Sequence, residues 1–301
     1  MNKIKLDEFL RALRLPFVTA CLFPYFFGVL RSGHSVNWFL LTLGAIVVGG
    51  THLSANLIND VADAKSGADN FDKRFFGFFG GSKLIQEGRL SVNWYFLAAI
   101  AMALCAGFAL LLITLKLGRW ETPILFAVVI GLAWQYSCKP LAFAYRGLGE
   151  FVVFGLFGPA ALAGGVFFSG AGYPTLEQWL LSCIFGFLTA GILIANEVPD
   201  APDDLHAGKR NLVVRIGRDK GWLLFAAVET LAWVTIVVSW YFGYLGTKTT
   251  LASFLGFPLA FKATSILRQK YEQKEELVIS SKLGIATQGV VSVILILGEL
   301  F

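Results

Sequence analysis

One short stretch of this chain, NDVADAKSGAD at residues 59–69, places a carboxamide and several carboxylates directly after a long apolar segment. On a continuing helix Asn59 and Asp63, four residues apart, share a face, whereas Asp60 leaves at a different angle. Gly67 allows a turn that would bring Asp69 back toward Asp63. Oxygen-bearing side chains of this kind are typical ligands of hard cations such as Mg²⁺ and Ca²⁺.

A second stretch, NEVPDAPDD at residues 196–204, repeats the arrangement after another apolar segment. Asn196, Asp200 and Asp204 follow one another at intervals of four residues and would form a stripe along one helix. Carboxylates on one helical face repel each other unless a cation lies between them. Mg²⁺ usually takes one or two carboxylates and shares the rest of its shell with water and phosphate oxygens. Two such stripes opposed across a bundle would therefore hold a metal–diphosphate group.

Each cluster alone also has a simpler interpretation. An Asp- and Asn-rich segment after a helix is often a solvated turn or a cap. An EF-hand is excluded by the spacing, because Lys65 would occupy a ligand position counted from Asp63. The two clusters match each other in residue type and in their position at the end of an apolar segment, which favours a paired binding site.

Basic residues that could neutralise a diphosphate follow or flank both clusters. The tendency of cytoplasmic loops to be basic is a sufficient explanation for each one alone, and spacing does not identify which of them contacts phosphate. The candidates are Lys83, Arg89, Lys139, Arg146, Lys209 and Arg210. Most aromatic residues are expected in packing or in interfacial belts. An aromatic wall would also suit a carbocation, and Tyr136 and Tyr145, on the expected cytoplasmic side near these clusters, are better candidates for it than mid-span Phe residues.

The composition predicts the elements that position these residues. Of the 301 residues, 56% are hydrophobic and 15% are charged, against about 25% charged in soluble domains. Continuous apolar runs predict an all-α polytopic membrane protein, not a β-barrel, with one domain over residues 1–301. We expect nine spans, at about 15–31, 38–58, 94–115, 122–138, 148–169, 177–196, 221–243, 249–266 and 279–298.

The distribution of basic residues predicts the orientation. With the N-terminus inside, all but four of the 25 Lys and Arg residues fall on the cytoplasmic side; the exceptions are Arg31, Lys116, Arg119 and Lys248. Both Asp clusters are then cytoplasmic and the C-terminus is outside. If the source is prokaryotic, we expect the protein in the plasma membrane. The amphipathic segment 1–14 carries no cleavage site of small residues, so we expect it to be retained on the cytoplasmic side.

With these motifs in view, the chain resembles the UbiA superfamily of intramembrane prenyltransferases. The resemblance rests on NDVADAKSGAD, then YSCKPLAFAYRGLGEFVVFGLFGP, then NEVPDAPDD, and it covers about residues 10–300. It implies nine transmembrane helices around a central cavity, with cytoplasmic helical caps that carry the Asp motifs. It also implies Mg²⁺ as cofactor and a polyprenyl diphosphate as one substrate.

The resemblance, together with the charge pattern, assigns roles to residues of this chain. The implied metal ligands are Asp60, Asp63, Asp69, Asp200 and Asp204. The expected diphosphate contacts are Asn59, Lys83, Lys139, Arg146, Asn196 and Lys209. The expected catalytic residues are Asp63, Asp200 and Tyr136.

Within the superfamily the chain looks like the 1,4-dihydroxy-2-naphthoate prenyltransferase branch of menaquinone biosynthesis. Gly67 stands where other branches place Asp, so the third carboxylate falls at Asp69, and the second motif continues into GKRNLVVRIG. Glu197 and Pro199 depart from the Asn and Arg that related sequences often have, which leaves the aromatic acceptor open.

Two alternatives remain. The same chemistry could act on 4-hydroxybenzoate, homogentisate, a porphyrin or a glycerol-phosphate lipid. A cation-coupled secondary transporter would also use Asp residues, although its sites lie near the bilayer midplane and these clusters lie at span ends. The expected partners are the prenyl diphosphate, a small aromatic acceptor and the lipid bilayer, with no nucleic acid.

Overall fold

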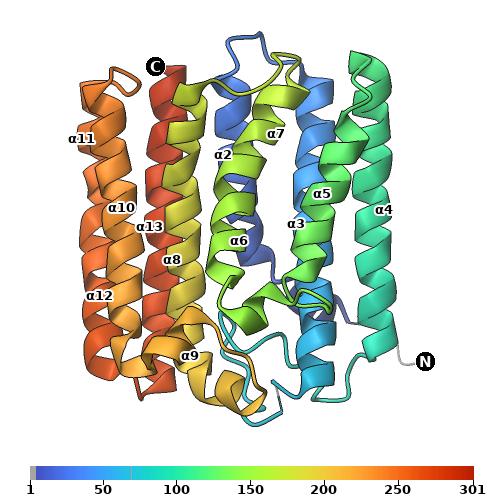
Figure 1. Cartoon of the computed structure of the whole chain (residues 1–301), viewed down its shortest axis with the longest axis vertical. Helices are drawn as coiled ribbons and strands as arrows, with labels where there is room; N and C mark the ends of the chain where they lie inside the picture. The colour runs from blue at the N-terminus through green and yellow to red at the C-terminus, as the bar shows by residue number, and fades with distance from the viewer. Residues whose placement is uncertain (1–4, 69) are drawn as a thin grey trace.

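The computed structural model describes residues 5–68 and 70–301, and over these ranges it contains helices and no strand. The helices run roughly side by side and form a bundle, with the two chain ends at opposite ends of it (Figure 1). Within these described ranges, eight segments are helical, long and apolar enough to cross a membrane: Leu6–Leu30, Trp38–Ser66, Val92–Leu117, Gly149–Phe168, Leu176–His206, Arg218–Tyr241, Thr247–Lys270 and Lys274–Leu300. The all-α class of an integral membrane protein is thus confirmed.

The fourth expected span is shorter than the others. Helix α5 (Thr122–Gln135) is apolar but has only 14 residues, about 21 Å of helix against about 30 Å of hydrocarbon. The chain then leaves the helix and continues through the 3₁₀ turn η2 (Phe143–Arg146). The number of nine spans therefore stays a prediction.

Four of the long segments are assembled from shorter pieces. The first comprises α1 (Leu6–Leu13), η1 (Leu15–Phe17) and α2 (Val18–Leu30). The fourth comprises α6 (Gly149–Gly155), the π-helical turn η3 (Leu156–Ala160) and α7 (Ala161–Phe168), and Pro159 within η3 lacks the N–H that a regular α-helix would use. The segment Arg218–Tyr241 comprises η4 (Arg218–Lys220) and α10 (Gly221–Tyr241). The segment Thr247–Lys270 comprises α11 (Thr247–Ser253), η5 (Phe254–Gly256) and α12 (Phe257–Lys270). The helices α4 (Val92–Leu117) and α13 (Lys274–Leu300) are continuous.

The two helices that carry the Asp motifs extend beyond the expected spans. Helix α3 (Trp38–Ser66) has 29 residues and α8 (Leu176–His206) has 31, so both stay helical through the polar residues that follow their apolar parts. Gly67, at φ +84°, ends α3 in the left-handed conformation that glycine adopts without steric cost. Both motifs lie at the same end of the bundle, the lower end in Figure 1, where α9 (Leu212–Ile216) also lies; we call it the motif end.

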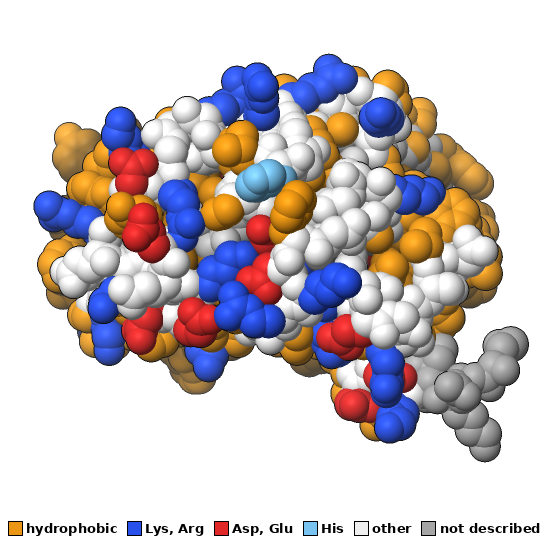
Figure 2. Space-filling view, turned by 90° about the horizontal axis from the view of Figure 1, so that it is seen from below, with side chains coloured by type: hydrophobic (Ala, Val, Ile, Leu, Met, Phe, Trp, Pro, Cys, Tyr) orange, Lys and Arg blue, Asp and Glu red, His pale blue; other side chains and the backbone are white. Residues whose placement is uncertain are grey.

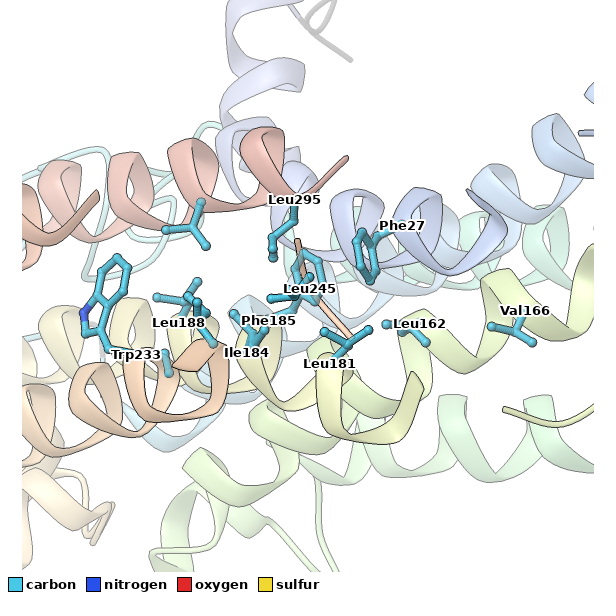
Figure 3. Close-up of a cluster of buried hydrophobic side chains, with 13 residues drawn as sticks. Phe27, Leu162, Val166, Leu181, Ile184, Phe185, Leu188, Trp233, Leu245 and Leu295 are labelled. Atoms are coloured by element: carbon cyan, nitrogen blue, oxygen red, sulfur yellow. The ribbon is translucent and has the colours of Figure 1, made fainter. Parts of the chain in front are cut away.

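A buried apolar cluster packs α8 against its neighbouring helices. Side chains from α2, α7, α8, α10 and α13 meet there, among them Phe27, Leu162, Phe185, Trp233 and Leu295 (Figure 3). Glycines allow the closest helix contacts, because an added Cβ at Gly28 of α2 would lie 2.2 Å from the carbonyl oxygen of Leu162 in α7. This packing fixes one wall of the space between α8 and α3.

Candidate active site

A cavity of about 540 Å³ lies inside the bundle among α2, α3, α5, the α6–α7 segment and α8. Apolar and aromatic side chains line most of its length, including Phe17, Val47, Phe126, Leu156, Phe157 and Phe167. Its motif end is lined by Asn59, Asp63, Asn196, Asp200 and Asp204. In the view onto this end, Lys and Arg side chains mix with Asp and Glu (Figure 2). The structure therefore brings the two motifs together at the polar end of an apolar cavity.

The first motif is held by the segment between α5 and α6. Asn59 Nδ2 donates to Asp63 Oδ2 at 3.1 Å and to Ser137 Oγ at 2.8 Å. The Tyr145 hydroxyl lies 3.0 Å from Asp63 Oδ1 and 2.6 Å from Ser66 Oγ. Burial, and next the negative charge of Asp63, raise the pKa of Tyr145, so this hydroxyl stays protonated at neutral pH. Asn59 and Asp63 thus share one helix face, as their spacing predicts.

The second motif contacts the loop that follows the first one. Asp200 Oδ2 accepts the backbone N–H of Gly80 at 2.8 Å. A Cβ at Gly80, where φ is +70°, would lie 3.5 Å from Asp200 Oδ1 and 3.6 Å from Lys83 Nζ. Asp204 Oδ2 accepts from Asn211 Nδ2 at 2.8 Å. The loop thus brings a backbone donor and the Lys83 ammonium to the second motif.

Lys209 connects the two motifs. Its Nζ atom lies 3.7 Å from Asp63 Oδ2 on α3 and 3.5 Å from Asp204 Oδ1 on α8. Burial alone would lower the pKa of Lys209, but Asp204 and Asp63 outweigh it and raise this pKa well above its usual value. A fixed positive charge therefore lies between carboxylates of both helices, at the wall of the cavity.

The donor set fits a Mg²⁺ ion that is shared with a phosphate ligand. Asn196 Oδ1 and Glu197 Oε2 are buried at the cavity wall, and neither accepts a hydrogen bond from the residues that the structure describes. Within residues 5–68 and 70–301, no group of three His, Cys, Asp or Glu side chains is close enough to hold a metal unaided. Mg²⁺ bound through one or two carboxylates and phosphate oxygens needs no such group. Asp69, the remaining expected ligand, lies outside the described residues.

Some expected site residues lie elsewhere. Asp60 is only 2% exposed and does not line the cavity; it accepts from the Arg14 guanidinium and, at 2.5 Å, from Ser82 Oγ. The reason is its position next to Asn59, since consecutive residues point in different directions around a helix. Lys139 and Arg146 are exposed and outside the cavity lining, and Arg146 donates to the Pro140 carbonyl at 2.8 Å.

Of the other expected residues, Lys83, Lys209 and Tyr136 do line the cavity. The sequence did not predict three hydrogen bonds at the site: Asn59 with Ser137, Asp200 with the Gly80 N–H, and Asp204 with Asn211. The glycine-rich run FGFFGGSK at 76–83 was a usable signal for the second contact, because glycines let a backbone approach a polar group closely. Ser137 and Asn211 carried no comparable signal.

Comparison with known proteins decides the family. Residues 21–283 match the UbiA prenyltransferase family. The chain belongs to this family. As a UbiA protein it is an intramembrane prenyltransferase, and the resemblance read from its motifs is confirmed.

Named relatives of this UbiA protein include two prenyl-type transferases. It is 27% identical to a 1,4-dihydroxy-2-naphthoate octaprenyltransferase of Mycobacterium tuberculosis, over 84% of this chain and 82% of that protein. It is also 27% identical to a 2-carboxy-1,4-naphthoquinone phytyltransferase of Synechocystis, over 89% of this chain and 84% of that one.

Solved structures share the fold. A UbiA homologue from Archaeoglobus fulgidus bound to GPP and Mg²⁺ aligns with a TM-score of 0.68 at 18% identity, over 97% of this chain and 98% of that one. A UbiA homologue from Aeropyrum pernix aligns with a TM-score of 0.73 at 17% identity, over 93% of this chain and 97% of that one.

Proposed function

We propose that this UbiA protein transfers a polyprenyl group from a polyprenyl diphosphate to an aromatic acceptor of the 1,4-dihydroxy-2-naphthoate type, in a Mg²⁺-dependent reaction. The observation that carries the proposal is the meeting of the Asn–Asp pairs of α3 and α8 around Lys209, at the polar end of an apolar cavity. The charged end of such a cavity can bind a diphosphate, and its apolar part can bind the attached isoprenoid tail.

The names of relatives support the choice of substrates. A fold neighbour was solved with GPP and Mg²⁺, and two relatives at 27% identity are named for naphthalene-type acceptors. The same chemistry on 4-hydroxybenzoate, homogentisate, a porphyrin or a glycerol-phosphate lipid is the alternative that the experiment below distinguishes.

The diphosphate would bind at the motif end. The Lys209 and Lys83 ammonium groups supply positive charge at the cavity wall, and the amide nitrogen of Asn196 can donate to phosphate oxygens. Asn59 lines the same end of the cavity, but its two N–H groups already donate to Asp63 and Ser137, so it would orient the first motif beside the diphosphate. Asp63, Asp200 and Asp204, with Asp69, would hold Mg²⁺, which when bound neutralises charge on the diphosphate. Asp60 would act indirectly, by fixing Arg14 and Ser82 beside the first motif.

The reaction breaks the bond between the first prenyl carbon and the diphosphate oxygen, whose electron pair leaves with the diphosphate. Fixed positive charge at the oxygen end favours this step, because negative charge grows there. The allylic cation that remains would lie among aromatic side chains of the wall, such as Tyr136 and Phe157, whose ring faces stabilise positive charge without attacking it. A ring carbon of the acceptor then forms the new carbon–carbon bond, and the proton that this carbon loses passes to the released diphosphate. Because the apolar wall excludes water, the cation is not hydrolysed.

The isoprenoid tail accounts for the membrane setting. Each buried CH₂ group favours the apolar phase by about 0.8 kcal/mol, so a soluble enzyme would have to extract a long tail from the bilayer at a large cost. In this protein the tail can pass from the bilayer into a cavity that is apolar along most of its length.

The test is incubation of the purified protein with Mg²⁺, geranylgeranyl diphosphate and a panel of aromatic acceptors, read by mass spectrometry. We expect prenylated 1,4-dihydroxy-2-naphthoate, and loss of product when Mg²⁺ is removed with EDTA. If only another acceptor is prenylated, that molecule is the substrate and the naphthoate assignment is wrong. No product with any acceptor, together with Asp63-dependent cation flux in proteoliposomes, would replace it with the transporter alternative.

A further inference from the structure

Two buried polar side chains of the C-terminal half, Glu229 of α10 and Gln288 of α13, lie outside the lining of the active-site cavity. Glu229 is 4% exposed, and neither of its carboxylate oxygens has a hydrogen-bond partner among the described residues. Gln288 is 1% exposed, and in the same part of the chain neither its amide oxygen nor its amide nitrogen has a partner. A carboxylate inside a membrane-spanning bundle is unfavourable unless its charge is balanced, so these two residues indicate a bound ligand or a proton.

The helix packing places these two residues at one level of the bundle. Helices α8 and α12 each pack against both α10 and α13, so the four helices form one group with α10 and α13 across its interior. A Cβ at Gly284 of α13 would lie 3.8 Å from a ring carbon of Phe225 in α10. Both helices run away from the motif end (Figure 1). Glu229 and Gln288 come four residues after this contact pair, so each lies on the same helix face about 6 Å further along.

A second contact lies on the other side of the two residues. A Cβ at Gly256 of η5 would lie 3.2 Å from Trp233 Cη2 and 2.9 Å from Val291 Cγ2. Trp233 comes one turn after Glu229 and belongs to the apolar cluster of Figure 3, as does Val291. The two polar side chains therefore lie between two packed layers, inside the group of four helices.

Three residues offer oxygen atoms at this level. Ser292 follows Gln288 by one turn on α13 and is fully buried, and its hydroxyl has no partner within the described ranges. On α8, Gly191 allows Glu229 to approach closely, because a Cβ there would lie 2.8 Å from Glu229 Oε1. A carboxylate, an amide oxygen and a hydroxyl are hard donors, which suit a hard cation.

The charge to be balanced here is a single negative one. Residues 178–196 of α8 include no charged side chain, and Lys262 of α12 and Lys248 of α11 are exposed. Lys282 of α13 lies six residues nearer the motif end than Gln288, with its Nζ atom 5.5 Å from the centre of the Phe78 ring. One carboxylate matches a monovalent cation, whereas Mg²⁺ would leave an uncompensated positive charge inside the bundle.

We propose that Glu229, Gln288 and Ser292 bind one Na⁺ ion inside the group formed by α8, α10, α12 and α13. The ion balances the Glu229 carboxylate, the other two side chains supply oxygen ligands, and internal water completes the shell. Binding links α10 to α13 and stabilises the C-terminal half of the bundle. The site is separate from the cavity, so its test does not depend on the proposed function.

The measurement is thermal unfolding of the purified full-length protein in detergent with EDTA, in NaCl and in choline chloride of equal ionic strength. We expect Na⁺ to raise the melting temperature of the wild type by about 2–4 °C, the shift that binding to the folded state produces at about ten times the dissociation constant. Glu229→Gln keeps the side-chain size and removes the charge, so its melting temperature should be the same in both salts. Gln288→Leu removes one oxygen ligand and should reduce the Na⁺ response, which provides a second variant if the first does not fold.

Two other variants are the controls, and both should keep the full Na⁺ response. Glu276→Gln removes an exposed carboxylate from the same helix, α13. Asp200→Asn removes a carboxylate from the cavity wall, where Na⁺ could also bind. If the response persists in Glu229→Gln, or is lost in Asp200→Asn, the ion binds elsewhere and the proposal is overturned.

The wild type alone can also refute the proposal. A melting temperature that does not respond to Na⁺ would show that only water lies between Glu229 and Gln288. A melting temperature that falls as the pH rises, again without a response to Na⁺, would show that a proton neutralises the carboxylate. Either result overturns the Na⁺ site.

Discussion

At the scale of single residues, Lys209 joins the two motifs, which lie on different helices. Its ammonium lies within 4 Å of Asp63 and of Asp204, which come from α3 and α8. One lysine thus balances carboxylates that would otherwise repel one another across the cavity. In the proposed function the same charge would also neutralise part of the diphosphate.

Asp63→Asn and Asp200→Asn test the assignment of these carboxylates. Each change keeps the side-chain size and removes a charge, so we expect at least about a hundredfold loss of prenyl transfer, the scale of losing one electrostatic contact to a transition state. The assay follows radiolabelled prenyl diphosphate, and gel filtration in detergent checks that the variants stay folded. Asp219→Asn, at an exposed position away from the cavity, is the control. Full activity in both site variants would refute the assignment.

At the scale of elements, the long helices α3 and α8 determine where the chemistry is possible. Each carries an apolar part inside the bundle and a polar part at the motif end, so one rigid element sets both the cavity wall and the ligand positions. The α6–α7 segment packs against α2, α3 and α8, and its packing on α2 depends on close backbone contacts. A Cβ at Gly165 of α7 would lie 2.1 Å from the backbone oxygen of Tyr25 in α2.

Gly165→Ala should therefore destabilise the bundle. The added methyl group can be accommodated only if α2 and α7 separate, which resembles overpacking of a core and costs about 1–3 kcal/mol. We expect a lower melting temperature in detergent. Gly164→Ala is the neighbouring control, because its Cβ would meet nothing closer than a Phe168 ring carbon at 3.7 Å. Equal melting temperatures for the two variants would show that this contact is not limiting.

At the scale of the whole molecule, the bundle places the chain ends at opposite ends of the long axis (Figure 1). The N-terminal segment packs at the motif end, where the Arg11–Glu87 and Arg89–Glu8 ion pairs tie α1 to the loop between α3 and α4. The distribution of Lys and Arg predicts that this end faces the cytoplasm. The acceptor, a polar aromatic molecule, would then reach the site from the aqueous side and the prenyl tail from the bilayer.

Reporter fusions test this orientation. Alkaline phosphatase fused to the C-terminus should be active in a bacterial host, because that end is expected outside, and green fluorescent protein fused there through the same secretory route should be dark. A fluorescent protein on the N-terminus should be bright. The reverse pattern would contradict the predicted orientation and would put the active site on the outer face.

The sequence by itself determined the helical membrane class and the family, and it located both Asp motifs. These properties are local: apolar runs of sufficient length must be helical in a bilayer, because every backbone polar group has to be satisfied within the segment. The spacing of Asn59 and Asp63 likewise fixes a shared helix face, whatever surrounds it.

Only the tertiary structure decided which of these residues meet. Among six basic candidates it brought Lys83 and Lys209 to the cavity and left Lys139 and Arg146 outside its lining. It also paired Asp60 with Arg14, which comes from a segment 46 residues away. Such choices depend on how loops return to the bundle and on which charges neutralise each other in a buried place. Both are properties of the packed molecule, which no spacing along the chain encodes.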